Sequence, residues 1–294
     1  MTKPRGAFVP VLTIVSVIFA VWYACAVLLN APFEWDQAER LGKETTWSKV
    51  VPATMAQKRP VLPAPHQVAQ EIWKTTVEKK ITSKRSLVYH ANITLSATLL
   101  GFVMGTLLGI ALAVGIVHSR VLDKSLMPWI ITSQTIPILA IAPMIIVVLN
   151  AVGISGLFPK AVISTYLSFF PVAVGMVKGL RSPEVMHLDL LKTYNASHNE
   201  TFCKLRLPAS MPYLFASMKV GIAASLVGAI VGELPTGAVA GLGARLLAGS
   251  YFGQTIQIWS ALIVAAILAG LLVAFIGYLG KLVNARMGVR GDAA

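Results

Sequence analysis

The chain has 294 residues, of which 56% are hydrophobic and 13% charged, and its formal net charge is +13. An average soluble domain is about 25% charged, so this composition excludes a water-soluble globular protein and predicts a multi-pass integral membrane protein. The basic residues are scattered and no aromatic platform accompanies them, so we expect the lipid bilayer, and no nucleic acid, as a partner.

Six apolar segments are each long enough to cross a bilayer, because about 20 helical residues cover its hydrocarbon core. We predict an all-α fold with spans at residues 9–29, 88–117, 125–151, 159–180, 212–232 and 256–280. The chain then divides into an N-terminal segment with the first span (1–30), an external loop (31–87), a five-span core (88–285) and a tail (286–294). The core includes a polar insert, 181–211.

Basic residues flank the spans in a way that predicts their orientation. Lys3 and Arg5 precede the first span, which is longer than the core of a signal peptide and is read as retained. Lys281, Arg286 and Arg290 follow the last span. Positive charge accumulates on the cytoplasmic side, so we expect both termini and the insert to be cytoplasmic.

The segment from Asn30 to Tyr89 is unusual for an external loop, since it carries ten Lys and Arg against six acids. Long loops cross membranes largely regardless of charge, so we still expect this segment to lie outside and both termini to be cytoplasmic. Three prolines between positions 60 and 65 predict an extended stretch. Apolar spacing over residues 68–81 then predicts a short helix on the outer membrane surface, with Trp73 at the interface.

The second span carries a stripe of small residues at every fourth position: Ala97, Gly101, Gly105, Gly109 and Ala113. Such a stripe lets another helix backbone approach closely. It predicts helix packing, either within the chain or against a second copy.

The third span is interrupted by three prolines and a polar run at positions 132–135. Polar groups and prolines are tolerated at this depth when they face protein or a water-filled path. The span therefore lines a translocation path or is a kinked helix whose hydroxyls bond freed carbonyls. The candidate path residues are Ser133, Gln134, Thr135 and Pro137.

The polar insert predicts two short helices joined by a sharp bend. Residues 184–194 form the first helix, and Asn195 ends it because Asn adopts the left-handed conformation readily. Ser197 and Glu200 match a capping box that starts a second helix.

The end of the insert is marked by two prolines. We expect Pro208 to end the second helix near Leu205, because a proline disfavours helix at the residue before it. Pro212 then opens the fifth span at its first turn.

The outer end of the fifth span carries the acid Glu233, followed by a glycine-rich segment and Arg245. Glu233 either lines or gates the path, or bonds the loop amides between Gly237 and Gly243. Arg245 either meets an anionic group or is a solvated charge. The histidines share no spacing typical of a metal site, so no metal is expected.

The insert resembles the EAA loop of ABC importer permeases. Asp189-Leu190-Leu191 stands at Glu-Ala-Ala, Asn195 at the glycine, and Leu205 with Leu207-Pro208 at Ile-x-Leu-Pro. The run from Leu207 to Lys219 is similar to that of the nitrate, sulfonate, taurine and bicarbonate permease group. Thr135-Ile136-Pro137, Glu233-Leu234 and Gly241-Leu242-Gly243 also resemble elements of that group, so the likeness covers roughly residues 60–290.

The resemblance implies a type I ABC importer permease fold in the bacterial inner membrane. It implies a second permease copy, giving a homodimer, with cytoplasmic ATP-binding subunits and an extracytoplasmic substrate-binding protein. The residues implied to couple the chain to the ATPase are Asp189, Asn195, Ala196, Ser197, Glu200, Phe202, Leu205 and Pro208.

No phosphate-binding Gly-x-x-x-x-Gly-Lys-Ser/Thr loop is present, so ATP and Mg²⁺ are expected on the partner ATPase. The chain itself is expected to bind no cofactor and to be no enzyme. The solute is either an anion like nitrate, a sulfonate or taurine, or a pyrimidine-like nitrogenous compound. The alternative is a proton- or ion-coupled secondary transporter, which predicts an internal repeat and mid-membrane acids, and neither is visible beyond Glu233.

Overall fold

The computed structural model describes residues 8–235 and 238–287, and within these ranges it contains helices and connecting segments but no strand. Lys3, Arg5 and Arg290, used above to predict orientation, and Gly237 lie outside the described residues. The chain divides into two compact units. The first unit comprises the residues up to Tyr89 together with Arg245–Val264, and the second comprises His90–Ala244 together with the residues from Ala265 onward.

In the first unit, α1 (Phe8–Arg40) runs well past the predicted end of the first span at residue 29. The buried side chain of Asn30 explains how the proline-rich stretch is held against it. Its amide donates to the Leu62 carbonyl at 2.8 Å, and its oxygen accepts from the Val61 N–H at 2.7 Å. The Trp22 indole donates to the Pro63 carbonyl at 3.0 Å. The predicted extended stretch is therefore fixed by side chains of α1.

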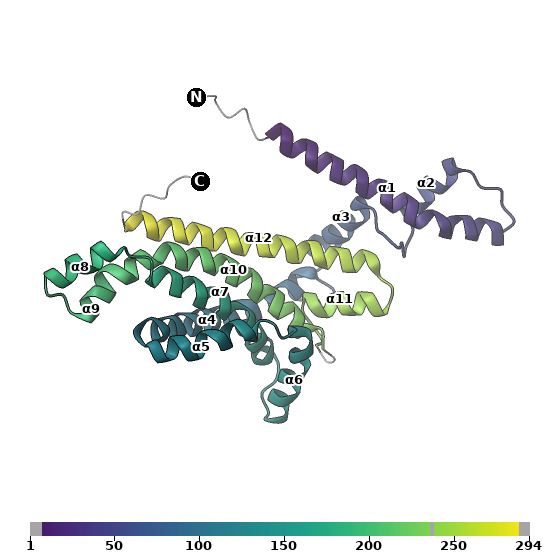
Figure 1. Cartoon of the computed structure of the whole chain (residues 1–294). Helices are drawn as coiled ribbons and strands as arrows, with labels where there is room; N and C mark the ends of the chain where they lie inside the picture. The colour runs from purple at the N-terminus through teal and green to yellow at the C-terminus, as the bar shows by residue number, and fades with distance from the viewer. Residues whose placement is uncertain (1–7, 236–237, 288–294) are drawn as a thin grey trace. The chain divides into compact units, whose positions relative to one another are not determined.

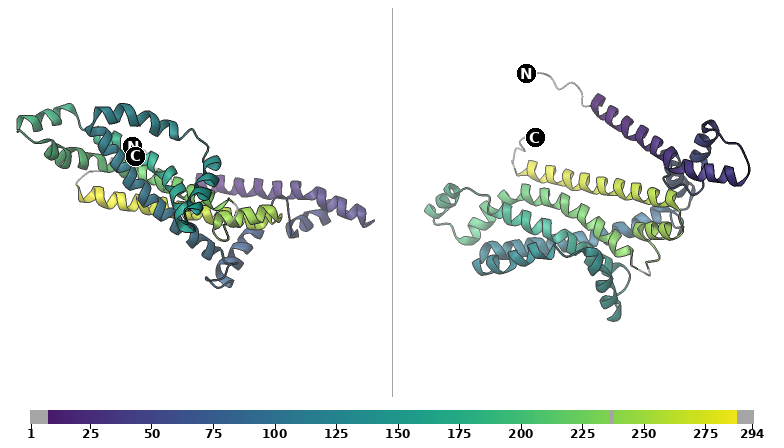
Figure 2. Two further views of the ribbon diagram at one scale, coloured as in Figure 1. Left: turned by 90° about the horizontal axis from the view of Figure 1, so that it is seen from below. Right: turned by 45° about the vertical axis from the view of Figure 1, so that its right-hand side comes forward.

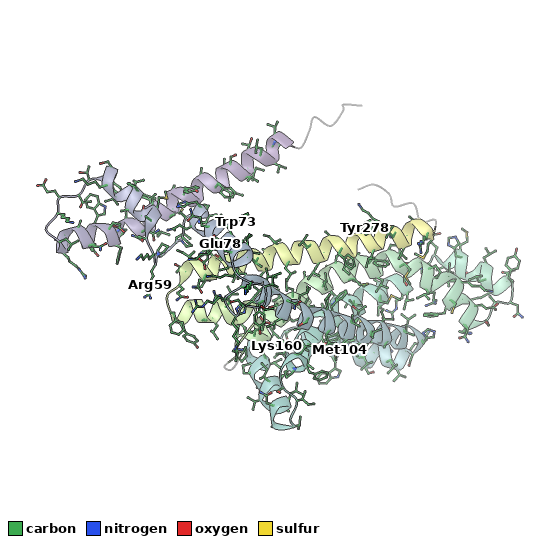
Figure 3. The ribbon with its side chains drawn as sticks, turned by 180° about the vertical axis from the view of Figure 1, so that it is seen from behind. Arg59, Trp73, Glu78, Met104, Lys160 and Tyr278 are labelled. Carbon is green, nitrogen blue, oxygen red and sulfur yellow. The ribbon has the colours of Figure 1, made fainter. Side chains whose placement is uncertain are left out.

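Two further helices lie in the predicted external loop. The α2 helix (Trp47–Ala56) was missed because it is short and contains Pro52. The α3 helix (Pro65–Trp73) continues through a π-helical turn (Lys74–Glu78) and confirms the helix expected over residues 68–81. Trp73, the last residue of α3, is 63% exposed and is labelled in Figure 3.

The second unit is built on α4 (Leu87–His118), α7 (Leu157–Leu180), α10 (Leu207–Glu233) and the larger part of α12 (Thr255–Arg286). The α7 and α10 helices pack along each other, as Figures 1 and 2 show. Among the described residues, five helices are long and apolar enough to cross a membrane: Val9–Arg40, Leu87–His118, Leu157–Leu180, His198–Glu233 and Thr255–Arg286. A bent helix pair supplies a sixth span if it counts as one.

The small-residue stripe of α4 packs against α7. A Cβ added to Gly101 would overlap Ser164, and one added to Gly105 would overlap Ser168. A Cβ on Gly109 would lie 2.8 Å from the Phe169 carbonyl oxygen. The stripe therefore brings α4 and α7 of the same chain into backbone contact. This agrees with the prediction of packing within the chain rather than against a second copy.

The predicted third span is two helices, α5 (Arg120–Ser133) and α6 (Ile138–Ala151), bent by 100°. The interruption predicted for the span over residues 125–151 is therefore a sharp break between two helices. Pro137 has no N–H and disfavours helix at the preceding residue, so α5 stops before it and α6 starts after it. Pro128 and Pro143 remain inside helices.

The predicted end of the insert is also wrong. A π-helical turn (Phe202–Arg206) leads directly into α10, so Pro208 does not end a helix and Pro212 lies inside α10. The Leu207 N–H bonds the Phe202 carbonyl five residues back. That shifted register puts Pro208 in the first two positions of α10, where no N–H is needed.

Candidate functional site: the coupling element and the outer cluster

The segment 181–206, called here the coupling element, contains α8 (Val185–Thr193) and α9 (His198–Thr201). Asn195 has φ +53° and is the one non-glycine residue with positive φ among the described residues. The Asn195 N–H bonds the Lys192 carbonyl at 2.9 Å, and the Ala196 N–H bonds the Leu191 carbonyl at 3.0 Å. This is a Schellman C-cap, as the sequence predicted for the bend.

The second helix starts at the predicted capping box. The Ser197 hydroxyl accepts from the Glu200 N–H at 3.2 Å, and the Glu200 carboxylate accepts from the Ser197 N–H at 2.9 Å. Lys204 pairs with the same carboxylate at 2.9 Å. The bend between the helices is thus fixed by bonds within a few residues of chain.

The other residues predicted for coupling are spread over this element. Asp189 is exposed and pairs with Lys192 at 2.8 Å. The Phe202 ring contacts the His118 ring edge-on, with centroids 5.0 Å apart. Leu205 is half-buried in the π-helical turn, and Pro208, just after the element, is half-buried in the first turn of α10.

The α8 helix also carries an apolar face that sequence reasoning missed. Met186, Leu190 and Tyr194 recur at every fourth position and are 70%, 53% and 77% exposed. Residues four apart lie on the same side of a helix, so these side chains form one surface. An exposed apolar surface of this kind is typical of a protein–protein contact. Their i, i+4 spacing was the signal that could have found them.

The four predicted path residues lie at the break between α5 and α6. Ser133 and Gln134 are half-buried, while Thr135 and Pro137 are exposed. The Ser133 hydroxyl donates to the Ile130 carbonyl at 2.7 Å, and the Thr135 hydroxyl to the Thr132 carbonyl at 2.8 Å. The Tyr166 hydroxyl donates to the Ser133 carbonyl. The hydroxyls therefore bond carbonyls at the helix end, and the break remains open to its surroundings.

Glu233 does not join the α5–α6 break. It is fully buried at the end of α10, where its carboxylate accepts from the Thr94 hydroxyl at 2.9 Å and from the Gly243 N–H at 2.8 Å. Lys160, labelled in Figure 3 near the start of α7, lies 3.7 Å from it and donates to the Ala240 carbonyl at 3.2 Å. Glu233 therefore stands where α4, α7 and α10 meet the segment around Ala240 and the first turn of α11 (Leu242–Tyr251).

This junction, called here the outer cluster, includes two further bonds, one from Gly241 and one from the first residue of α11. The Leu242 N–H bonds the Thr94 hydroxyl at 2.8 Å, and the Gly241 N–H bonds His90 Nδ1 at 3.0 Å. Gly241 has φ +131°, and a Cβ there would overlap the Glu233 carboxyl group. The glycine is required by both its conformation and the close approach. Thr94, Lys160 and His90 were missed because nothing in their local sequence links them to Glu233.

Arg245 belongs to the other compact unit. Its side chain is partly buried, and its Nε has no hydrogen-bond partner among the described residues. Burial lowers the pKa of the Arg245 guanidinium from its ordinary value, while Glu71 acts in the opposite direction. It is therefore no freely solvated charge.

Within the described residues, no group of three or more His, Cys, Asp or Glu is arranged to hold a metal ion. Neither polar region therefore offers a metal site in the part of the chain that the structure covers.

Comparison with known proteins gives concordant matches. The model of the family described as "Binding-protein-dependent transport system inner membrane component" matches residues 105–289. A probable ABC transporter permease protein of Haemophilus influenzae is 30% identical over 69% of this chain and 78% of its own length. The riboflavin transport system permease protein RibX of Chloroflexus aurantiacus is 30% identical over 76% of this chain and 79% of its own.

Two further matches are more distant. The formylaminopyrimidine transport permease protein ThiX of Halalkalibacterium halodurans is 28% identical over 66% of this chain and 72% of its own. A chain of the inward-facing MetNI methionine ABC transporter superposes with a TM-score of 0.55 at 20% identity, covering 74% of this chain and 96% of that one. At 20% identity, the similarity to the MetNI chain shows a shared fold only.

Proposed function

This chain belongs to the family of binding-protein-dependent transport system inner membrane components, and we propose from that membership how it works as the permease subunit of an ABC importer. It is a multi-pass inner-membrane protein with a type I importer permease fold, and it is a transport subunit without enzymatic activity. The family supports an ATPase and a substrate-binding protein as partners. ATP and Mg²⁺ are proposed to bind only to the ATPase.

The apolar face of α8 carries the proposal that the coupling element docks on the ATPase. Met186, Leu190 and Tyr194 present apolar side chains to the surroundings from a helix that buries none of its residues within this chain. Apolar surface removed from water by a partner contributes about 25 cal/mol per Å². A cleft on the ATPase that covers this face would gain that free energy.

Chain continuity supports transmission from this contact to the membrane. The coupling element follows directly on α7 and leads without a break into α10. These two helices pack along each other, so a rigid movement of the element displaces both. ATP-driven closure of the ATPase would in this way alternate access to the path.

The proposed orientation places the coupling element and both termini in the cytoplasm. Counting the bent pair as one span gives an even number of crossings, which is what this orientation requires. The path is proposed to run past Ser133, Gln134, Thr135 and Pro137 at the α5–α6 break, between this chain and a second, identical copy. Glu233 is proposed to act behind the path by holding the outer loop.

The substrate is proposed to be a small nitrogenous ring compound. The relatives named as riboflavin and formylaminopyrimidine transport permeases are 30% and 28% identical to this chain. Relatives named for aliphatic sulfonates or nitrate are 24% identical, and this difference supports the nitrogenous class. A thermal-shift screen of the cognate binding protein against pyrimidines, flavins, nitrate, taurine and alkanesulfonates tests it. Stabilisation by the anions alone would reject the proposal.

The docking proposal is tested with Leu190→Glu, which puts a charge in the centre of the exposed face. We expect loss of ATPase co-purification and of uptake, with normal membrane insertion. Ser125→Glu adds the same charge at an exposed position beside Lys124 and should leave both unchanged. Wild-type ATPase retention in Leu190→Glu would refute docking through this face.

A further inference from the structure

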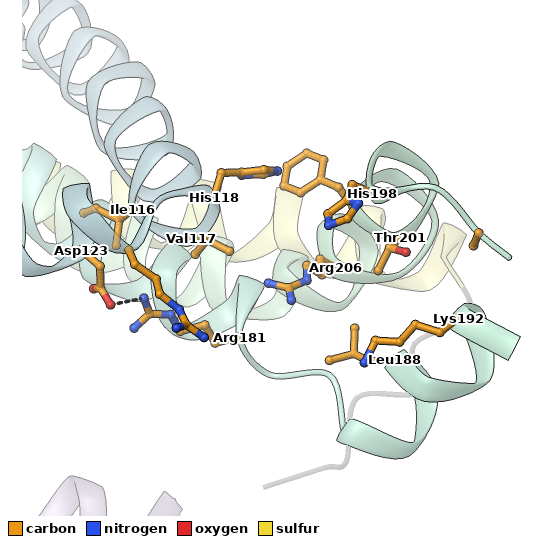
Figure 4. A pocket seen from close by; sticks show the side chains of 13 residues that line it. Ile116, Val117, His118, Asp123, Arg181, Leu188, Lys192, His198, Thr201 and Arg206 are labelled. Carbon is orange, nitrogen blue, oxygen red and sulfur yellow. Dashed lines mark ion pairs between the residues drawn. The ribbon is translucent and has the colours of Figure 1, made fainter.

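A hollow of about 650 Å³ lies between the coupling element and the ends of α4 and α5. Figure 4 shows it from close by, with Leu188 and Lys192 of α8 on one side and His118 and Asp123 on the other. Leu188 and Lys192 fall on the side of α8 opposite Met186 and Leu190. The hollow is therefore separate from the face proposed to dock on the ATPase.

The lining of this basic hollow is dominated by cationic side chains. Arg120, Arg181, Lys192 and Arg206 all contribute to it, together with two histidines. Asp123 is the one acid in the lining, and it pairs with Arg181 at 2.9 Å, the contact drawn dashed in Figure 4. A local excess of positive charge remains after this pair is counted.

Two of the guanidinium groups have no ion-pair partner among the described residues. Lys192 is held by Asp189 at 2.8 Å, whereas Arg120 and Arg206 make no ion pair with any described residue. Arg206 is half-buried, so part of its hydration is already removed. A guanidinium group binds a phosphate through two parallel N–H···O bonds, which suits these two residues to a phosphate ligand.

Apolar side chains also line the hollow, at the point where the long helices end. Ile116 and Val117 are in the last turn of α4, and Phe202 faces His118 across the hollow. The α7 helix ends at Leu180, immediately before Arg181. The hollow thus combines cations with apolar walls where long apolar helices end. Basic pockets between such helices bind anionic lipid headgroups.

We propose that the basic hollow binds a phosphate group, supplied by the headgroup of an anionic phospholipid. Arg120 and Arg206 hold the phosphate oxygens, and the apolar wall of Ile116, Val117 and Phe202 lies against the first part of the acyl chains. In the orientation proposed above, the lipid belongs to the cytoplasmic leaflet. A lipid seated there touches α8 on one side and α4 on the other, so it links the coupling element to the membrane surface.

The test uses the full permease–ATPase complex and native mass spectrometry of bound lipid. Phosphatidylglycerol and phosphatidylcholine with identical acyl chains are titrated separately, and inorganic phosphate is added as a competitor. We expect a preference for phosphatidylglycerol that falls about fivefold in Arg120→Gln and in Arg206→Gln, since each surface cation contributes about that factor. Lys124→Gln removes the same charge from an exposed position of α5 outside the hollow and should retain the preference.

The outcomes separate the sources of the phosphate. A lipid preference that is equal in wild type and both arginine variants overturns the proposal. Displacement of the lipid by millimolar inorganic phosphate, without headgroup preference, overturns the lipid source and assigns the site to a free anion. Loss of ATPase from Arg206→Gln with unchanged lipid binding also overturns it, and assigns these arginines to an acidic surface of the ATPase.

Discussion

The coupling element and the outer cluster each contain a glutamate that accepts a backbone N–H, in different surroundings. Glu200 is exposed, and its partners Ser197 and Lys204 lie within four residues of chain. Glu233 is fully buried, and its partner Thr94 is 139 residues away in the sequence. The first arrangement needs only its own segment, and the second exists only when several helices have packed.

This difference assigns the two regions different tasks. A locally capped element keeps its shape when a partner approaches or withdraws, because none of its helix-fixing bonds depends on the membrane core. The outer cluster joins α4, α7 and α10 to the start of α11, so it fixes the ends of these helices that meet there. The coupling element is suited to move as a rigid part. The outer cluster is suited to hold together the helices that such a movement displaces.

The largest expected effect is that of Glu233→Ala. The substitution removes the charge partner of Lys160 and the carboxylate that accepts from the Thr94 hydroxyl and the Gly243 N–H. Breaking a buried ion pair from one side costs about 3–5 kcal/mol. We expect a clear fall in the thermal unfolding midpoint of the purified complex. The Glu233→Gln variant keeps an acceptor oxygen, so it should lose less stability than Glu233→Ala and should retain uptake. If Glu233→Gln lost uptake at normal stability, Glu233 would instead be assigned to the translocation path.

The next effect is that of Gly105→Leu in the seam between α4 and α7. The added side chain overlaps Ser168, so the two helices must separate, and overpacking of this kind costs about 1–3 kcal/mol. The unfolding midpoint should fall. Gly270→Leu is the matched control, because no atom lies within 4 Å of a Cβ at that helical position. Equal losses in the two variants would show that side-chain size, and not the seam, is responsible.

A smaller and more local effect is expected for Ser197→Ala. Loss of an N-cap hydroxyl costs about 1 kcal/mol, and here the cost falls on α9 alone. Hydrogen–deuterium exchange at the Glu200 amide should accelerate about fivefold while the global unfolding midpoint stays the same. Ser197→Asp retains an acceptor and should exchange as wild type does. If the thermal unfolding midpoint of Ser197→Ala fell as far as that of Glu233→Ala, the contrast between the coupling element and the outer cluster would be wrong.

The smallest stability effect is expected for Asp123→Asn. Its pair with Arg181 is partly exposed, with side-chain exposures of 35% and 45%, and exposed pairs contribute about 0.2–1 kcal/mol. The same change frees the Arg181 guanidinium in the basic hollow, so binding of phosphatidylglycerol should tighten. Glu184→Gln removes an equal charge from an exposed position outside the hollow and should leave lipid binding unaltered. Weaker lipid binding in Asp123→Asn would contradict the proposed charge balance.

Sequence patterns predicted the elements whose cause is local. The bend at Asn195, the capping box at Ser197 and the long helices follow from residue conformation, side-chain capping and apolar length. Pro208 was misjudged because a π-helical turn shifts the hydrogen-bond register ahead of it. Three prolines predicted an irregular third span, but the sequence did not show that the break lies at Pro137 or that it bends the chain by 100°.

The sequence alone determined that the chain is a membrane protein with a capped insert between its fourth and fifth spans. Those features depend on hydrophobic length and on interactions within a few residues. Only the tertiary structure decided that the small-residue stripe faces α7, that Glu233 meets Thr94 and Lys160, and that Arg120 and Arg206 line one hollow. These contacts join residues far apart in the chain, and their positions depend on how whole helices pack.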